Sequence, residues 1–177
     1  MRKKFLQYIQ PICRHMKGIE DNSIMKFLAK NLVVFYILSF TWGFITSFIG
    51  LLILLPLVFT KRVGKAYGRL YGVFPEAFGS GWGFEMGCFF FVSQDYEGDL
   101  KIYSHEMGHG LQNILFGPLM LFIVNIPSAI RFWYRELKYF RKGEFPKTLY
   151  EDIWFEKQAS DWGRKYITHY NDTNVFL

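Results

Sequence analysis

Uncharged and charged stretches alternate along this chain, and the longest uncharged one comprises residues 31–60. It carries no charged side chain between Lys30 and Lys61. Because about 20 apolar residues span the hydrocarbon core of a bilayer, this stretch is predicted to be a transmembrane segment. It is longer than one span and shorter than two. A tilted helix, or one kinked near Gly50 or Pro56, is therefore expected in preference to a hairpin.

The segments on either side of this stretch have different patterns. Residues 1–30 interleave apolar and basic side chains, which favours an interfacial segment on anionic headgroups; a solvated charged tail is the alternative. Residues 61–100 are rich in glycine and aromatic residues, which predicts turns and short strands. The run over residues 88–93 is typical of a strand. It is either a core strand or an edge that offers main-chain hydrogen bonds to an extended substrate.

A helix is predicted to begin after Asp99, which is a favourable N-cap residue. Apolar residues then recur at every fourth position, which places them on one helix face: Tyr103, Met107, Leu111 and Leu115. The opposite face carries the most informative feature of the chain. It reads His105-Glu106-Met107-Gly108-His109, which is the pattern H-E-x-x-H.

The H-E-x-x-H pattern predicts a catalytic zinc site. Residues four apart lie on one face of a helix, so the imidazoles of His105 and His109 can bind one tetrahedral metal ion. Glu106 lies one step round the helix, where its carboxylate can take a proton from a metal-bound water. Gly108 and Gly110 permit a close approach of backbone or substrate. The alternative is a chance match, in which hydrogen bonds alone satisfy the two histidines.

A catalytic zinc ion takes three protein ligands and keeps one position open. Among the downstream acids, Glu156 is the preferred third ligand. The sequence around it is typical of a helix, and the small Ala159 allows close packing on a neighbouring helix. Asp161 and His169 are the alternatives as ligands. Ser160 or Asp161 is expected to hydrogen-bond the imidazole of a ligand histidine.

Hydrolysis at this site also needs a donor that stabilises the oxyanion. Tyr150, Tyr166 and His169 are the candidates, and the sequence does not choose among them. Gln112, one turn beyond His109, is expected either to support the site or to cap a neighbouring backbone group.

Residues 111–130 form a second uncharged stretch, interrupted by Gly117-Pro118 and Pro127. A full crossing here would place Glu156 across the bilayer from the two histidines, unless the metal lay at membrane depth among packed helices. We expect instead an interfacial or re-entrant segment made of short helices, because proline interrupts helical hydrogen bonding. The basic residues on both sides of residues 31–60 leave the topology open.

The composition agrees with a membrane protein of one domain. The 177 residues are 51% hydrophobic, and they are enough for one compact domain plus membrane segments. The net charge of +6 comes from basic residues that flank apolar segments without a nucleic-acid-binding motif, which favours lipid headgroups over nucleic acid as partner. Cys13 and Cys88 fit no metal or redox spacing and are expected to be free thiols.

The region from residue 80 to residue 163 resembles a widespread group of largely uncharacterised bacterial membrane proteins. The resemblance rests on HEMGHGLQ, on FGPL and IPS downstream of it, and on WFEKQA. More broadly, the chain is similar to gluzincins, in which a helix carrying Glu supplies the third zinc ligand after H-E-x-x-H. The resemblance implies His105, His109 and Glu156 as zinc ligands and Glu106 as catalytic base. Many gluzincins have Asp four residues after the third ligand, and Ser160 occupies that position here.

Together these patterns predict a mainly α, gluzincin-like zincin with a short β element before the H-E-x-x-H helix. We expect a basic interfacial segment over residues 1–30, a transmembrane segment over residues 31–60 and a metallopeptidase domain over residues 61–177. The expected protein is integral to the cell membrane, binds one Zn²⁺ per chain and hydrolyses a peptide or protein substrate as a metalloendopeptidase. The alternative is a non-catalytic regulatory or binding protein of the membrane that keeps the metal site for its structure.

Overall fold

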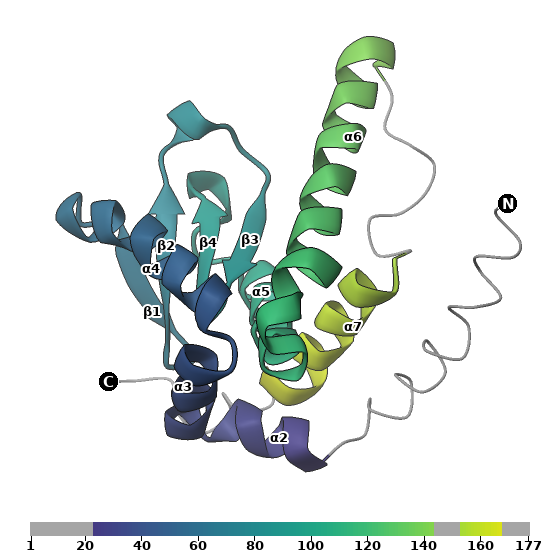
Figure 1. Cartoon of the computed structure of the whole chain (residues 1–177). Coiled ribbons are helices and arrows are strands. Elements are labelled where there is room, and N and C mark those ends of the chain that lie inside the picture. The colour runs from purple at the N-terminus through teal and green to yellow at the C-terminus, as the bar shows by residue number, and fades with distance from the viewer. Residues whose placement is uncertain (1–22, 144–152, 168–177) are drawn as a thin grey trace, which may run out of the picture.

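Figure 1 shows the computed structural model of the chain, which describes residues 23–143 and 153–167. The described part is mainly helical and contains one small mixed sheet, as the sequence predicts. Its α-helices are α2 (Ser23–Lys30), α3 (Leu32–Thr41), α4 (Phe44–Phe59), α5 (Leu100–Phe116), α6 (Ile126–Lys142) and α7 (Trp154–Trp162). Its strands are β1 (Val63–Ala66), β2 (Arg69–Phe74), β3 (Gly83–Met86) and β4 (Phe89–Ser93).

The four strands form one sheet in the order β1-β2-β4-β3. β1 and β2 pair as an antiparallel hairpin, β3 and β4 pair as a second one, and β2 and β4 run parallel between them. β4 is buried along its whole length, because it lies inside the sheet and packs against both α4 and α5. The predicted turns and short strands over residues 61–100 are thus confirmed. Of the two alternatives for residues 88–93, the structure shows the core strand, and β1 and β3 are the edge strands instead.

The helix that carries H-E-x-x-H begins as predicted. The carboxylate of Asp99 accepts hydrogen bonds from the backbone N–H groups of Lys101 and Ile102, at 2.8 and 3.2 Å. Along α5, the predicted apolar stripe faces the core, where Met107 and Leu111 are almost completely buried. Capping and burial together therefore fix the rotation of α5 and the direction in which its histidines point.

The longest uncharged stretch folds as two helices, so the expectation of one helix over residues 31–60 is wrong. α3 ends at Thr41 and α4 begins at Phe44. The break lies at Trp42-Gly43, and the expected kink sites Gly50 and Pro56 both lie within α4.

Tertiary hydrogen bonds explain the position of this break. Three polar side chains of the stretch are fully buried: Ser39, Thr46 and Ser47. Thr46 donates to Oδ1 of Asn113 on α5 at 2.6 Å, and Ser47 donates to the carbonyl of Ser39 at 2.8 Å. A Cβ on Gly43 would overlap the amide of Asn113. The turn between α3 and α4 therefore packs directly on α5.

Within residues 23–143 and 153–167, no single helix has both the length and the apolar composition needed to cross a membrane. Two pairs of consecutive helical segments meet those criteria when the two members of a pair are taken together, but both pairs are sharply bent. α2 and α3 meet at 100°, and residues 100–119 meet residues 121–142 at 113°. Insertion of residues 31–60 into a membrane stays a prediction.

The second uncharged stretch is broken into short helical pieces, as predicted. α5 ends at Phe116, a 3₁₀ turn covers Gly117–Leu119, and a π-helical turn over Leu121–Asn125 leads into α6. The expectation that Pro127 also interrupts this stretch is wrong. Pro127 lies in the first turn of α6, where its missing N–H removes no helical hydrogen bond.

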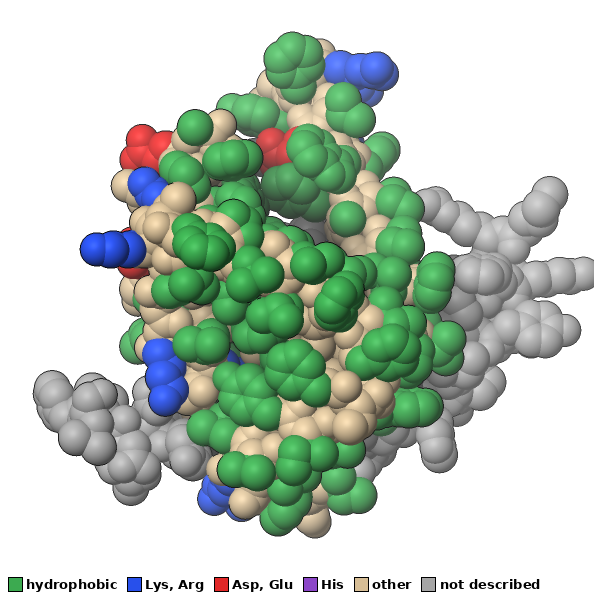
Figure 2. All heavy atoms as spheres, turned by 60° about the vertical axis from the view of Figure 1, so that its left-hand side comes forward, with side chains coloured by type: hydrophobic (Ala, Val, Ile, Leu, Met, Phe, Trp, Pro, Cys, Tyr) green, Lys and Arg blue, Asp and Glu red, His purple; other side chains and the backbone are tan. Residues whose placement is uncertain are grey.

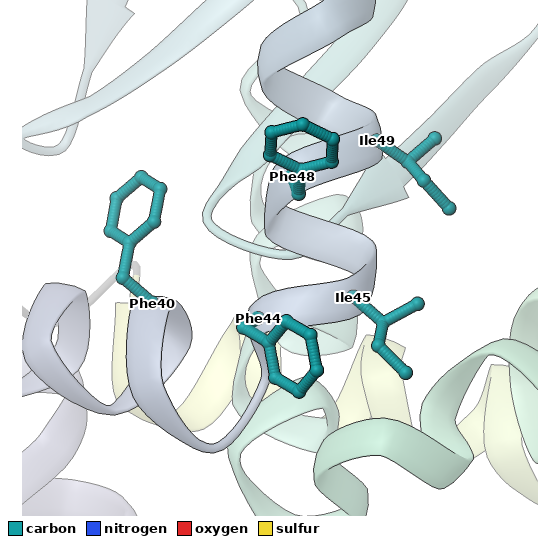
Figure 3. Close-up of a pocket in the computed structure, with 5 residues that line it drawn as sticks. All are labelled: Phe40, Phe44, Ile45, Phe48 and Ile49. Carbon is teal, nitrogen blue, oxygen red and sulfur yellow. The ribbon is translucent and has the colours of Figure 1, made fainter.

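One face of the molecule is covered with exposed hydrophobic side chains, as Figure 2 shows. They lie on α3 and α4 and continue along α6, which projects from the body of the molecule (Figure 1). Near the turn between α3 and α4, the surface forms a groove of about 510 Å³. Only apolar residues line this groove (Figure 3): Phe40, Phe44, Ile45, Phe48 and Ile49.

α5 and α7 cross at a very short distance, because glycines lie at the crossing. A Cβ on Gly108 would overlap the carbonyl oxygen of Ala159, and a Cβ on Gly163 would overlap the carbonyl oxygen of Ser104. Ala159 is completely buried. The close helix packing predicted for Gly108 and Ala159 is thus confirmed.

We expect Gly108→Ala to lower the free energy of unfolding by about 1–3 kcal/mol, because the added methyl group overlaps the backbone of α7. Urea unfolding of the detergent-purified protein, followed by tryptophan fluorescence, measures this change. Lys101→Ala is the control, since Lys101 is exposed on the same helix. Equal unfolding midpoints for Gly108→Ala and the wild type would contradict the close crossing.

Candidate metal centre

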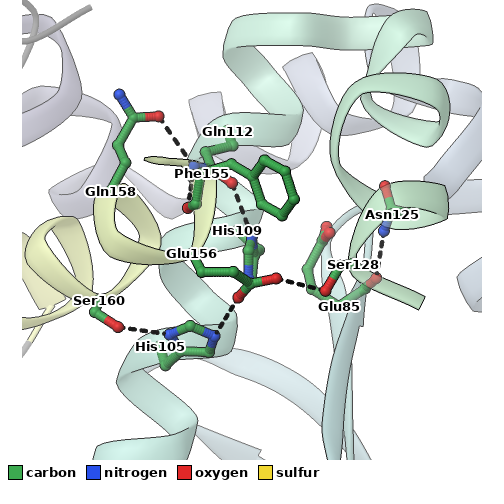
Figure 4. A network of polar contacts seen from close by, with 10 residues as sticks. All are labelled: Glu85, His105, His109, Gln112, Asn125, Ser128, Phe155, Glu156, Gln158 and Ser160. Atoms are coloured by element: carbon green, nitrogen blue, oxygen red, sulfur yellow. Dashed lines mark hydrogen bonds and ion pairs between the residues drawn. The ribbon is translucent and has the colours of Figure 1, made fainter. Parts of the chain in front are cut away.

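Three side chains from two helices meet at one point (Figure 4). His105 and His109 lie on α5, and Glu156 lies in the first turn of α7. Oε2 of Glu156 is 3.2 Å from Nε2 of His105 and 3.1 Å from Nε2 of His109. The candidate ligand atoms all lie within 4.8 Å of one another. The structure therefore brings together the three side chains that the sequence proposed as metal ligands.

The second nitrogen of each imidazole has a hydrogen-bond partner of its own. Nδ1 of His105 lies 2.9 Å from Oγ of Ser160, and Nδ1 of His109 lies 2.8 Å from Oε1 of Gln112. Ser160 thus makes the contact that the sequence predicted for it. The sequence left two roles open for Gln112, and the structure shows both. Its Oε1 supports the site through His109, and its Nε2 donates to the backbone carbonyl of Phe155 at 2.8 Å.

These contacts determine which nitrogen of His109 carries its proton. The carbonyl oxygen of Phe155 can only accept a hydrogen bond, so Gln112 must turn its NH₂ group towards it. Oε1 of Gln112 then accepts from Nδ1–H of His109, and Nε2 of a neutral His109 keeps its lone pair. That lone pair faces a carboxylate oxygen of Glu156 at 3.1 Å. Two acceptors at this distance need a cation between them, which is either a proton or a metal ion.

The three side chains are close enough together to hold a metal ion. Ligand atoms at about 2.0–2.1 Å from a tetrahedral zinc ion lie roughly 3.3 Å from one another. The two N–O separations of the cluster, 3.2 and 3.1 Å, are close to that value. The side chain of His105 is 17% exposed and that of Glu156 is fully buried. The cluster is therefore accessible from the side of His105.

Without a metal ion, the charges of the cluster are strongly coupled. Burial alone would raise the pKa of Glu156, but the two imidazoles facing its carboxylate hold that pKa well below its usual range. Burial alone would lower the pKa of His109, but Glu156 and the other nearby carboxylates raise it to about 9. A proton therefore occupies the place between His109 and Glu156 in the metal-free protein, and a binding metal ion has to displace it.

The carboxylate of Glu106 lies against the sheet and is close enough to His105, His109 and Glu156 to interact with them electrostatically. Its side chain is buried against β3, where a Cβ on Gly83 would lie 2.8 Å from Oε1 of Glu106. Within the described residues, its carboxylate is not part of the ligand cluster. Burial raises the pKa of Glu106 more than the two neighbouring imidazoles lower it. This location suits a proton acceptor better than a metal ligand.

Three further residues of the site were missed from the sequence: Glu85, Asn125 and Ser128. Oγ of Ser128, in the first turn of α6, donates to Oε1 of Glu156 at 2.5 Å. Nδ2 of Asn125 donates to the backbone carbonyl of Glu85 on β3 at 2.9 Å. Ser128 belongs to the IPS motif, which was the one signal that pointed to it. No local pattern marks Asn125 or Glu85.

Glu85 is a buried acid near the cluster (Figure 4), close enough to His109 to interact with its imidazole electrostatically. Glu85 is 3% exposed, and neither of its carboxylate oxygens accepts a hydrogen bond from the described residues. Burial raises its pKa to about 8, against the lowering effect of the imidazole of His109. Glu85 is therefore mostly protonated and neutral at pH 7.

The other residues proposed from the sequence lie elsewhere or outside the described residues. The carboxylate of Asp161 pairs with Nη2 of Arg164 at 2.6 Å. Tyr166 is buried in the main hydrophobic core. Tyr150 and His169 lie outside the described residues, as do Cys13 and most of the basic N-terminal segment, and Cys88 is a buried free cysteine as expected.

Comparison with protein-family models, with curated proteins and with solved structures found no match to this chain.

We expect Ser160→Ala and Gln112→Leu each to weaken zinc binding by about 10- to 100-fold, because the ligand imidazole loses the hydrogen bond that orients it. Competition with a chromophoric chelator measures the Kd. Asp161→Asn is the control, since Asp161 adjoins Ser160 in the chain but pairs with Arg164. Wild-type affinity in both test variants would rule out this supporting role.

The stability of the metal-free protein should depend on pH through Glu85. Its pKa is about 8 when folded and about 4.3 in an unfolded chain, so the folded state binds a proton that the unfolded state releases between these values. The stabilisation is fully present below the unfolded pKa and is lost as the pH rises through 8. Urea unfolding midpoints across this range should therefore fall more steeply for the wild type than for Glu85→Gln. Glu97→Gln, a change at an exposed acid, should keep the wild-type slope.

Proposed function

We propose that this chain is a membrane-anchored zinc metallopeptidase that hydrolyses peptide bonds with water. The proposal rests on one observation above all. Nε2 of His109, whose lone pair is fixed by Gln112, faces the same carboxylate oxygen of Glu156 as Nε2 of His105 does. A carboxylate that can accept a proton, that of Glu106, adjoins this cluster on the same helix.

Each side chain of the site has its own role in the proposed hydrolysis. His105, His109 and Glu156 would hold the zinc ion, which polarises the scissile carbonyl and lowers the pKa of water towards neutrality when it is bound. Glu106 takes a proton from the attacking water and delivers it to the leaving amine. The burial of Glu106 supports this role, because burial raises its pKa and a raised pKa makes the carboxylate a stronger base. Ser128 orients Glu156 by a hydrogen bond to its second oxygen.

The rival interpretation is a structural metal site in a non-catalytic regulatory or binding protein. Structural zinc sites are normally closed by four protein ligands. Within the described residues the cluster has three, and one of them, His105, reaches the surface. The arrangement leaves a position for water or substrate, which favours catalysis over a purely structural role.

Exposed apolar surface supports the membrane anchor. α3 and α4 carry no charged residue, and their exposed side chains include Val33 at 73% and Phe59 at 84%. A soluble monomer seldom exposes so large an apolar patch. The 16 residues of α4 extend about 24 Å, which is less than the hydrocarbon core of a bilayer. We therefore propose that α3 and α4 enter the bilayer together.

We expect Glu106→Gln to keep its zinc and lose peptide hydrolysis, because its carboxylate moves protons and does not bind the metal. His105→Ala, His109→Ala and Glu156→Ala should lose the zinc, because two ligands hold the ion only weakly. Elemental analysis of the detergent-purified protein measures the metal. New termini in a peptide library, detected by mass spectrometry, measure the hydrolysis.

Two results would count against the proposal. A zinc-loaded wild-type protein that cleaves no peptide of the library would argue for the structural metal site. Loss of zinc from Glu106→Gln as complete as from His105→Ala would contradict the assignment of Glu106 as the base.

A further inference from the structure

α6 carries an exposed apolar stripe along its whole length. The members of this stripe recur at spacings of four and three residues, and each is at least 41% exposed: Ile126, Ile130, Trp133, Leu137 and Phe140. This spacing places them on one side of a helix. No residue of α6 is buried, and the helix projects from the body of the molecule (Figure 1). The proposed metal centre accounts for none of these side chains.

A basic stripe lies on the side of α6 nearly opposite the apolar one. It consists of Arg131, Arg135, Lys138 and Lys142, each five residues after a member of the apolar stripe. Five residues correspond to a rotation of about 140° round the helix, so the two stripes are separate and parallel. Glu136 is the one acidic residue of α6. The helix therefore combines a strong positive charge with an exposed apolar side.

We propose that α6 lies in the interface of an anionic membrane, with its apolar stripe at the acyl boundary and its basic stripe on the lipid headgroups. Trp133 and Tyr134, which are 64% and 61% exposed, are of the residue types enriched at that depth. The apolar side of α6 continues the exposed face of α3 and α4 (Figure 2). One membrane can therefore contact all three helices.

A second copy of the chain would fit α6 less well than lipid does. Apolar residues at spacings of four and three also suit a coiled coil. However, α6 carries five basic residues and one acidic residue, so two copies side by side would bring two helices of like net charge together. Anionic headgroups complement the same charge.

The inference also bears on the substrate, and in this respect it rests on the proposed function. Ser128, in the first turn of α6, donates a hydrogen bond to Glu156. The helix that lies on the membrane thus contacts one of the candidate metal ligands directly. A polypeptide segment held at the membrane surface is therefore the substrate class that this arrangement fits.

Site-specific fluorescence of the full chain tests the position of α6. Cys13→Ser and Cys88→Ala remove the two native thiols, and Trp133→Cys or Lys142→Cys then provides one labelling site for an environment-sensitive dye. Both positions are exposed in the structure and belong to the same helix. The protein is placed in nanodiscs of phosphatidylcholine, with or without phosphatidylglycerol. Dye emission and quenching by aqueous iodide are then measured.

We expect the dye at position 133 to shift to the blue and lose its iodide quenching in phosphatidylglycerol discs, while the dye at position 142 stays quenched. Arg135→Glu combined with Lys138→Glu should restore the quenching at position 133, because it reverses the charge of the basic stripe. Equal quenching at the two positions would overturn the proposal. The proposal would also be overturned if position 133 were protected from iodide in detergent and light scattering showed a dimer there. Equal protection with and without phosphatidylglycerol would overturn the anionic requirement.

The same samples separate this inference from the proposed function. Glu106→Gln should leave the dye pattern unchanged, because Glu106 lies on α5 and not on α6. Protection at position 133 in a protein that cleaves no peptide would refute the peptidase alone. Protein that stays with the discs while position 133 remains quenched would refute the interfacial placement of α6 and leave the anchor through α3 and α4 intact.

Discussion

The close crossing of α5 and α7 is the contact on which the candidate metal centre depends. Because Gly108 has no side chain, the backbone of Ala159 rests directly on α5, and Gly163 repeats this contact at Ser104. Glu156 lies one turn before Ala159 on the same helix, so the crossing sets its height over the two histidines. A shift of α7 by a single turn is about 5.4 Å, which would carry the carboxylate beyond the reach of both imidazoles. Packing between backbones, more than the ligand side chains themselves, therefore assembles the cluster.

α5 is in turn held by buried polar contacts on several sides. Arg69 of β2 donates to the carbonyl of Met107 at 2.9 Å, and its guanidinium lies 3.8 Å from the centre of the Phe35 ring. Burial lowers the pKa of Arg69 to about 10, so it remains charged at neutral pH. On another side, Thr46 of α4 donates to Asn113. These contacts link the H-E-x-x-H helix to the sheet and to the apolar helices, which keeps its histidines in a fixed orientation before any metal binds.

The same framework joins the candidate site to the apolar surface of the molecule. Asn113 ties α5 to the turn between α3 and α4, and Ser128 ties Glu156 to α6. Both connections start from helices that expose large hydrophobic side chains. The exposed apolar surface and the candidate metal cluster therefore belong to one packed unit. In the proposed peptidase, this arrangement places hydrolysis close to the surface from which a membrane-bound polypeptide would arrive.

The sequence by itself determined the features that depend on near neighbours. The Asp99 cap, the buried stripe of α5, the H-E-x-x-H spacing and the break at Gly117-Pro118 all follow from interactions within a few residues. It also singled out Glu156 and Ser160, because a small Ala159 beside them indicated close helix packing. The break at Trp42-Gly43 was decided only by tertiary structure, since Thr46 and its partner Asn113 are 67 residues apart. The same holds for Glu85, Asn125 and Ser128, whose places beside the cluster depend on how a strand and a helix pack around α5 and α7.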